Sequence, residues 1–304
     1  METVLTTQGL CKHYGRFKAL DGLNMQVPKG AIYGLVGKNG AGKTTLIRVI
    51  CGLQAPTAGS YSLFGTGCGE RNLQRIRRRM GAVVETPSLY PDMTAIQNLK
   101  LQHRVLGLPD DRGIPELLEL VSLSDTGKKK AGHFSLGMKQ RLGIAVALCG
   151  NPDFLVLDEP INGLDPQGIV EIRELILKLN RERQITVLIS SHILDELSRL
   201  ATHYGFIDGG RMVKEVSARD LEAACRKCVR VEVTSTLPLT RVLDNLGLEY
   251  QVLSRTQADI YGKVNISKLV EALKQESCDL ISVKERDESL ESYYINLVGG
   301  EKNG

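Results

Sequence analysis

Residues 37–44 of this sequence have the types and spacing needed to bind phosphate groups. They read Gly-Lys-Asn-Gly-Ala-Gly-Lys-Thr, the pattern G-x-x-x-x-G-K-T, between a predicted strand and a predicted helix. Glycines let the backbone wrap closely around phosphate oxygens, and the start of a helix offers N–H donors and a partial positive charge. The alternative is a glycine-rich turn that caps an ordinary helix. The flanking strand and helix favour a phosphate-binding loop made of Gly37, Lys38, Asn39, Gly40, Ala41, Gly42, Lys43, Thr44 and Thr45.

Two adjacent carboxylates, Asp158 and Glu159, follow the apolar run Phe154 to Leu157. Phosphoryl transfer needs one acid to hold Mg²⁺ and another group to orient or deprotonate the attacking water. Because side chains alternate along a strand, the two carboxylates point different ways. Alone, such a pair is typical of a solvated turn. Together with the phosphate loop, it predicts Asp158 and the Thr44 hydroxyl as Mg²⁺ ligands and Glu159 as general base.

Two further polar groups flank apolar runs and have both a functional and an ordinary interpretation. His192 follows the run 185–191, at the carboxyl end of a predicted parallel strand, the edge where α/β sheets place ligands. It could donate to a γ-phosphate, or it could be an ordinary surface histidine. Ser135 and Gly137 precede an apolar helical run, where backbone N–H groups could bind an anion. The simpler alternative there is a serine N-cap.

The elements that must position these residues alternate along the first two thirds of the chain. We predict strands at 4–10, 23–27, 31–37, 81–85, 153–160 and 185–191, and helices at 42–53, most of 94–149, 169–182 and 192–201. Near-continuous apolar strands alternating with helices indicate a mainly parallel sheet covered on both faces. After about residue 216 the order becomes strand, helix, strand, strand, helix, strand, typical of a small ferredoxin-like α+β unit. A short amphipathic segment at 288–300 follows this unit.

Composition and charge narrow the function classes. The 304 residues suffice for one large and one smaller domain, and no run of about 18 apolar residues or signal-peptide pattern occurs, so we expect a cytoplasmic protein. The basic runs at 75–80 and 128–130 lack interleaved aromatics, which favours solvated faces over a nucleic-acid surface. The seven scattered cysteines indicate reduced thiols. Cys225 and Cys228 form a lone C-x-x-C without a second pair, which argues against zinc or redox chemistry there.

In combination and in this order, the motifs resemble the ATP-binding subunit of an ABC transporter over residues 1 to about 215. Residues 37–44 match the Walker A loop, and Asp158 with Glu159 match the end of Walker B. The resemblance also assigns roles outside these two motifs. Tyr14 would stack on adenine, Asp165 would be the D-loop aspartate and His192 the switch histidine. Phe-Ser-Leu-Gly-Met at 134–138 would be the signature motif.

This resemblance implies an α/β P-loop NTPase domain at 1–216, with a RecA-like core, an antiparallel β subdomain and a helical subdomain at about 88–150. The ferredoxin-like unit at 217–304 would be an accessory domain. In the family, two ATPase domains pack head to tail, so Ser135 and Gly137 would contact the ATP that a second subunit of a homodimer or heterodimer holds, with ATP and Mg²⁺ as the cofactors. A transmembrane permease would be the other partner, which would place the chain on the inner face of the membrane; no nucleic-acid partner is expected.

Three residues depart from the family pattern. Leu136 and Met138 replace a glycine and the glutamine of the signature motif, and Glu85 stands at the Q-loop glutamine. A positive φ at Leu136 would cost about 1–2 kcal/mol. A carboxylate about 4 Å from a phosphate charge would be repelled by about 4 kcal/mol at an effective dielectric of 20, unless it faced Mg²⁺. We therefore expect Glu85 to be a variant metal contact. The departures resemble the bacitracin and lantibiotic export branch, so we do not expect an inactive site.

The expected function is ATP hydrolysis that drives a separate permease, with a peptide antibiotic, drug or lipid-like molecule as exported cargo. One alternative is a soluble ABC ATPase acting in translation or on DNA. Such proteins carry two ATPase domains or a long inserted coiled coil, and this sequence contains neither. The other alternative is a hydrolysis-poor regulatory module, supported only by Glu85 and Leu136. The presence of Lys43 and Glu159 argues against it.

Overall fold

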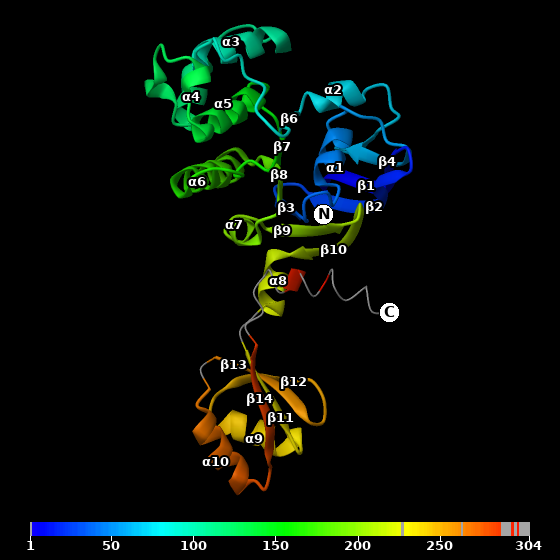
Figure 1. The fold of residues 1–304 in the computed structure, drawn as a ribbon, viewed down its shortest axis with the longest axis vertical. Helices are drawn as coiled ribbons and strands as arrows, with labels where there is room; N and C mark the ends of the chain where they lie inside the picture. The colour runs from blue at the N-terminus through cyan, green and yellow to red at the C-terminus, as the bar shows by residue number, and fades with distance from the viewer. Residues whose placement is uncertain (1, 226–227, 263, 287–292, 295–296, 298–304) are drawn as a thin grey trace. The chain divides into compact units, whose positions relative to one another are not determined.

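The computed structural model describes residues 2–225, 228–262, 264–286, 293–294 and 297 (Figure 1). The chain divides into two compact units, Met1–Ala218 and Arg219–Gly304. This division falls beside the predicted domain border at residues 216–217. Each unit has its own sheets and its own apolar core.

A six-stranded sheet in the order β10-β9-β3-β8-β7-β6 forms the centre of the first unit. Its strands are β3 (Ile32–Val36), β6 (Met80–Val83), β7 (Phe154–Asp158), β8 (Thr186–Ser191), β9 (His203–Asp208) and β10 (Arg211–Ser217). Strands β9, β3, β8, β7 and β6 run parallel, and only β10 pairs antiparallel in this sheet. Every residue of β3, β7 and β8 is buried, which requires cover on both faces. The predicted parallel sheet is confirmed, although the sequence patterns did not identify β9 and β10.

A second, antiparallel sheet in the order β2-β1-β4-β5 packs beside the first helix of the unit. Its strands are β1 (Thr3–Tyr14), β2 (Phe17–Pro28), β4 (Ala58–Leu63) and β5 (Thr66–Gly67). Strands β1 and β2 are longer than predicted. Register shifts at 7–10 and 10–12 of β1 bend the ladder, and they interrupt the apolar alternation on which the prediction depended. We did not predict β4 and β5.

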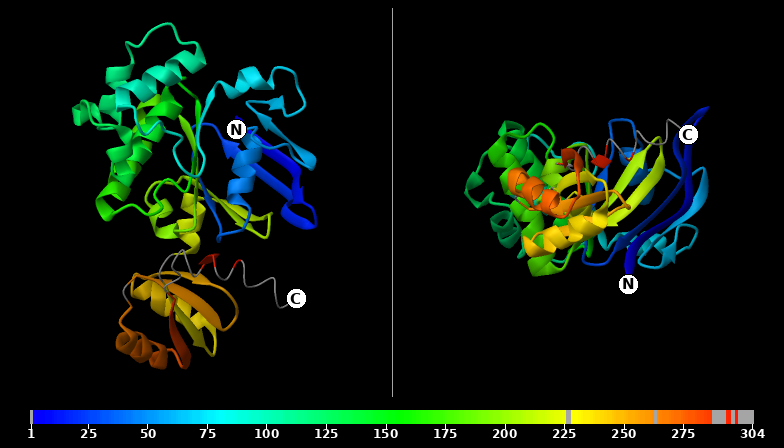
Figure 2. Two further views of the ribbon diagram at one scale, coloured as in Figure 1. Left: turned by 45° about the horizontal axis from the view of Figure 1, so that its top comes forward. Right: turned by 90° about the horizontal axis from the view of Figure 1, so that it is seen from below.

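Helices cover the six-stranded sheet, with α1 on one side and α5, α6 and α7 on the other (Figures 1 and 2). The helices are α1 (Lys43–Ile50), α2 (Leu73–Arg77), α3 (Ala95–Leu106), α4 (Ile114–Leu120), α5 (Leu136–Leu148), α6 (Pro166–Arg183) and α7 (Leu194–Ser198), with the 3₁₀ turns Ser124–Thr126 and Ala131–His133. Helices α3, α4 and α5 pack on one another as the helical subdomain. Helix α6 begins three residues earlier than predicted, because Asp165 caps its first turn and Pro166 fits the first helical position.

The second unit is a four-stranded antiparallel sheet with two helices. After α8 (Ala218–Ala224), which spans the division, come β11 (Cys228–Val233), α9 (Thr236–Asn245), β12 (Glu249–Val252), β13 (Gln257–Tyr261), α10 (Ile266–Gln275) and β14 (Leu280–Arg286). The sheet order is β12-β13-β11-β14, and residues such as Val231, Leu243 and Ile260 form the core. This is the predicted order of strands and helices. The predicted amphipathic segment at 288–300 lies outside the described residues, apart from 293–294 and 297.

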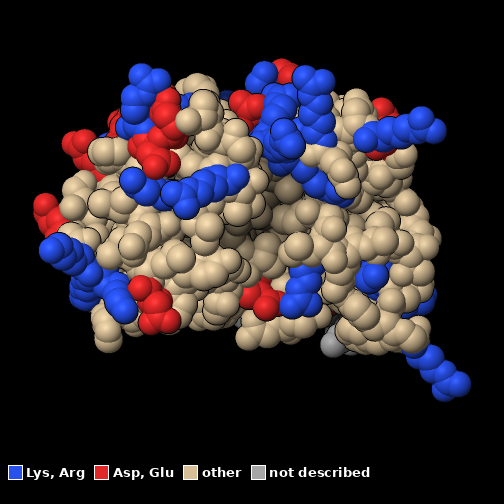
Figure 3. Space-filling model, turned by 90° about the horizontal axis from the view of Figure 1, so that it is seen from above, with Lys and Arg blue, Asp and Glu red and all other residues tan. Residues whose placement is uncertain are grey.

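The basic run at 128–130 lies on the surface of the first unit, as predicted for a solvated face. Lys128, Lys129 and Lys130 are all exposed, and Lys and Arg side chains gather around a hollow on the face shown in Figure 3. No helix within the described ranges is both long and apolar enough to cross a bilayer. The seven cysteines, all of which lie in described positions, form no disulfide.

Candidate active site

The loop after β3 is shaped by glycines that no other residue could replace without a clash. A Cβ on Gly37 would lie 2.6 Å from the Ile207 carbonyl oxygen, and one on Gly42 would lie 2.7 Å from the Ala19 carbonyl oxygen. Gly42 also has φ of 111°, in the region that favours glycine. It precedes α1, whose first turn has no side-chain cap. The sequence therefore builds a tight loop that leads into an uncapped helix N-terminus, the arrangement that binds phosphate.

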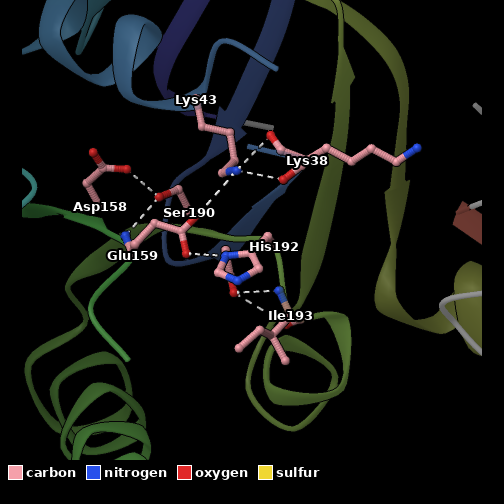
Figure 4. Close-up of polar contacts among 9 residues, drawn as sticks. Lys38, Lys43, Asp158, Glu159, Ser190, His192 and Ile193 are labelled. Atoms are coloured by element: carbon pink, nitrogen blue, oxygen red, sulfur yellow. Dashed lines mark hydrogen bonds and ion pairs between the residues drawn. The ribbon is translucent and has the colours of Figure 1, made fainter. Parts of the chain in front are cut away.

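Lys43 and Glu159 meet beneath this loop, and His192 extends this chain of polar contacts (Figure 4). The Lys43 ammonium donates to the carbonyl oxygens of Gly37 at 2.6 Å and Lys38 at 3.2 Å. It also lies 3.2 Å from Glu159 Oε1, while Glu159 Oε2 lies 2.8 Å from His192 Nδ1. The structure thus brings three predicted site residues together from α1 and from the carboxyl ends of β7 and β8.

The Glu159 backbone is held in an uncommon conformation. Its φ is 48°, in the left-handed region that costs a side-chain-bearing residue about 1 kcal/mol or more. The backbone N–H of Glu159 donates to Ser190 Oγ at 2.9 Å. This turn directs the carboxylate of Glu159 toward Lys43 and His192, whereas Asp158 remains within the strand.

Ser190 is a buried site residue that the sequence analysis did not identify. Its hydroxyl donates to Asp158 Oδ1 at 2.6 Å and accepts from the Glu159 N–H, so it links both carboxylate residues. Asp158 and Ser190 are register partners on the neighbouring strands β7 and β8. The available signal was a polar pair, Ser190 and Ser191, that ends an otherwise apolar run opposite Asp158.

We expect Ser190→Ala to lower the free energy of unfolding by about 1–3 kcal/mol, because it leaves a buried carboxylate oxygen and a backbone N–H without their partner. ATP turnover should also fall, since Glu159 loses the bond that fixes its turn. Chemical denaturation and a steady-state ATPase assay measure both effects. Ser198→Ala, which removes an exposed hydroxyl at the end of α7, is the control and should change neither. An unchanged denaturation midpoint in Ser190→Ala would refute the bridging role.

Asp158 has the properties of a ligand for a hard cation. Its side chain is only 1% exposed, and among the described residues it forms no ion pair. A buried carboxylate that receives one hydroxyl hydrogen bond is poorly compensated, and a divalent cation bound by oxygen ligands would offset its charge. The residues present therefore fit Mg²⁺, with Thr44 and Asp158 as the groups that would hold it.

A cavity of about 250 Å³ opens over the phosphate loop. It is lined by Phe17, Ala19, Asn39, Gly40, Gly42, Lys43, Thr44, Thr45, Glu159 and Asn162. Tyr14 lies on the same β1–β2 hairpin as Phe17, but its hydroxyl donates to Gln54 and it does not line this cavity. Adenine stacking by Tyr14 stays a prediction. Phe17, which the sequence analysis did not single out, is the aromatic ring that lines the cavity.

Ser135 and Asp165 form a second cavity of about 450 Å³, which shares no lining residue with the first. Ser135 caps α5 by accepting from the Met138 N–H at 3.3 Å, and Asp165 caps α6 by accepting from the Gly168 N–H at 2.9 Å. Gly137 also lines this cavity, so two helix N-termini border it. Leu136 is the first residue of α5 and is not among the residues with positive φ, so the backbone cost considered for it does not arise.

Glu85 lies apart from the phosphate loop. Its carboxylate forms an ion pair with Arg48 of α1, and both line a separate cavity of about 500 Å³ that also includes Arg77. Glu85 does not line the cavity that contains Lys43 and Thr44. The cation beside Glu85 is therefore Arg48, whereas the sequence-based prediction was Mg²⁺. This geometry gives no support to Glu85 as a metal ligand.

We expect Glu85→Gln to change the Mg²⁺ concentration that gives half-maximal ATP turnover by less than about twofold, because Glu85 pairs with Arg48. Asp158→Asn should raise that concentration at least about tenfold, since a neutral amide replaces the anionic ligand. A Mg²⁺ titration of the ATPase rate measures both. The free energy of unfolding should fall by at most about 1 kcal/mol in Glu85→Gln, because the lost ion pair with Arg48 is exposed. A large shift in Glu85→Gln would restore the metal-contact hypothesis.

Comparisons with known proteins show the family to which this chain is similar. Residues 20–162 match the family described as ABC transporter. The chain is 40% identical over 303 residues to the bacitracin transport ATP-binding protein BcrA of Bacillus licheniformis, with 99% of each chain covered. It is 43% identical over 212 residues to the lantibiotic transport ATP-binding protein SrtF of Streptococcus pyogenes, which covers 70% of this chain and 90% of that protein. Its fold is similar to the dimeric ATP-binding cassette MJ0796 bound to ADP and Pi, with a TM-score of 0.64, 25% identity and coverage of 71% and 99%.

Proposed function

Because the chain belongs to the ABC transporter family as an ATP-binding, ATP-hydrolysing subunit, we propose that it pairs head to tail with a second such subunit and drives a separate membrane permease. The observation that carries this proposal is the separation of two half-sites in one chain. The first cavity contains Lys43 and Glu159, and the second contains Ser135 and Asp165. Head-to-tail pairing would place each anion-binding helix start over the nucleotide of the partner.

In the proposed active site, the first cavity holds ATP and its own side chains prepare the attacking water. Lys43 neutralises phosphate charge, and Thr44 with Asp158 would hold Mg²⁺, which would screen the phosphate oxygens. Glu159 accepts the proton of the water at a carboxylate oxygen. His192, 2.8 Å from Glu159, orients that carboxylate and is available to donate to the γ-phosphate. Ser135 and the N–H groups near Gly137, from the partner, complete the site.

We propose that the transporter exports a peptide antibiotic. A drug and a lipid-like molecule are the other cargo classes. The support is the likeness to BcrA along 99% of the chain, together with the likeness to SrtF. The permease would hold the chain at the inner face of the cell membrane. Residues 217–304 would act as an accessory unit, in regulation or in dimer contacts, and the pairing would be between two copies of this chain.

A genetic experiment tests the transport proposal. Deletion of the gene should sensitise its host to a peptide antibiotic, and the wild-type chain should restore resistance whereas Glu159→Gln should not. Purification of the tagged chain from solubilised membranes, followed by mass spectrometry, should recover one polytopic membrane protein in fixed ratio. Restoration of resistance by Glu159→Gln, or a purified chain without any membrane protein, would contradict the proposal.

A further inference from the structure

Three metal-ligating side chains gather on the β1–β2 hairpin, away from the catalytic carboxylates. Cys11 and His13 belong to β1, and their spacing of two residues puts them on one face of the strand. Asp21 comes from β2, next to the residues that pair with this part of β1. One potential ligand atom from each residue lies within 4.8 Å of the others. Over the described part of the chain, this is the one such group of three.

The hairpin positions these groups through its irregular pairing. The ladder shifts register between Leu10 and Lys12 and again before His13. These shifts increase the local twist and bend of the strands and re-aim side chains. The N–H of Gly22 consequently donates to Cys11 Sγ at 3.2 Å, which holds the thiol beside the Asp21 segment.

His13 provides an independent sign that the cluster lacks a component. Its Nε2 atom is buried and, among the residues that the structure describes, has no hydrogen-bond partner. Buried polar atoms in native proteins nearly always have a partner, whether a protein group, a water or an ion. A histidine ring with such a nitrogen, in a group that also contains a thiol and a carboxylate, is therefore suited to coordinating a metal.

The Asp21 carboxylate already contacts two cationic side chains. Arg211 donates to Asp21 Oδ2 at 2.6 and 3.0 Å, and Lys18 lies 3.3 Å from Oδ1. Two cationic side chains thus already occupy positions around this carboxylate, and a metal ion would compete with them.

We propose that Cys11, His13 and Asp21 bind one Zn²⁺ ion, with water as the fourth ligand. Thiolate, imidazole and carboxylate are the ligands that Zn²⁺ takes in proteins, in a tetrahedral arrangement. Bond lengths of about 2.0–2.3 Å place tetrahedral ligand atoms about 3.3–3.8 Å apart, so modest side-chain rotations within the 4.8 Å cluster suffice. The Cys11 thiol loses its proton to solvent as the sulfur–zinc bond forms, and the Asp21 oxygen that binds zinc gives up its contact with Arg211 or Lys18.

The position of the proposed site gives it a structural consequence for nucleotide binding. The hairpin turn that follows His13 leads to Phe17 and Ala19, which line the cavity over the phosphate loop. A metal that joins β1 to β2 would therefore restrain the strand that carries these two residues. Amide hydrogen exchange in residues 11–21 should be slower with Zn²⁺ than after treatment with a chelator.

Zn²⁺ competition against a chromophoric chelator tests the site in the full-length chain, freed of metal beforehand. Wild type should bind one Zn²⁺, and Cys11→Ser and His13→Gln should each weaken binding at least about 100-fold. Cys68→Ser, which alters another partly exposed thiol, and the double variant Cys225→Ser with Cys228→Ser should bind as wild type does. Co²⁺ substitution should give a thiolate-to-metal charge-transfer band in wild type and in both controls, but not in Cys11→Ser.

Arg211→Gln makes the test independent of variants that remove a ligand. It should raise Zn²⁺ affinity several-fold, because it removes a cation that competes for Asp21. Thermal melts of the metal-free variants identify any that fail to fold, and a folded His13→Gln is enough to decide. Equal affinity in wild type, Cys11→Ser and His13→Gln, or loss of binding only in the Cys225 and Cys228 variant, would overturn the proposal.

Discussion

Glu159→Gln is expected to lower ATP turnover at least about 100-fold while ATP still binds. Glu159 is the one carboxylate among the described residues that line the cavity over the phosphate loop. The substitution replaces it by an amide of the same size, which cannot accept the proton of the attacking water. It also removes the negative charge between Lys43 and His192. Under the proposed pairing, the bound but uncleaved nucleotide should hold two chains together, so a dimer should accumulate on size-exclusion chromatography with ATP and Mg²⁺.

The control for this prediction is Glu119→Gln, an exposed glutamate on α4 for which turnover should be unchanged. Nucleotide binding, measured with a fluorescent ATP analogue, should be within a few-fold of wild type in both variants. Undiminished turnover in Glu159→Gln would refute the general-base assignment. A loss of nucleotide binding equal to the loss of turnover would assign Glu159 a role in holding Lys43 instead.

The sequence predicted the catalytic groups best where a local motif and its flanking elements agree. The loop 37–44 and the pair Asp158 and Glu159 were found because each follows a continuous apolar strand, which the structure gives as β3 and β7. The parallel sheet followed from the same runs. What these patterns do not contain is strand order. That order puts Ser190 opposite Asp158 and brings Lys43 within 3.2 Å of Glu159.

Glu85 illustrates a different limit. The prediction assumed that Glu85 faces a phosphate, and a repulsive energy then required a nearby cation. The cation is Arg48 on the exposed part of α1, and the two residues are 37 positions apart in sequence. No periodicity relates them, because their contact depends on how the segment after β6 leaves the sheet. The charge argument assumed a phosphate beside Glu85, whereas the structure pairs this carboxylate with Arg48.

Ser135 permits a substitution that separates helix capping from contact with a partner's nucleotide. Aspartate and asparagine both serve as N-caps about as well as serine, so Ser135→Asp and Ser135→Asn should keep the α5 start and the melting temperature. They differ by one negative charge in the second cavity. If that cavity covers the γ-phosphate of a second subunit, Ser135→Asp should lower ATP turnover at least about 100-fold more than Ser135→Asn, because unscreened like charges repel strongly at short range. ATP affinity of the monomer should be the same in both.

A mixing experiment decides whether Ser135 acts on its own nucleotide or on that of a partner. Ser135→Asp keeps an intact phosphate loop, and Lys43→Met keeps an intact Ser135; each alone should be nearly inactive. In a mixed dimer of head-to-tail geometry, one composite site carries both defects and the other carries neither, so mixing should restore ATP turnover. If Ser135 instead served the nucleotide bound to its own chain, every site in the mixture would contain one defect, and activity would stay absent. Restoration therefore requires that the active site be divided between two chains, as the separate cavities around Lys43 and Ser135 suggest.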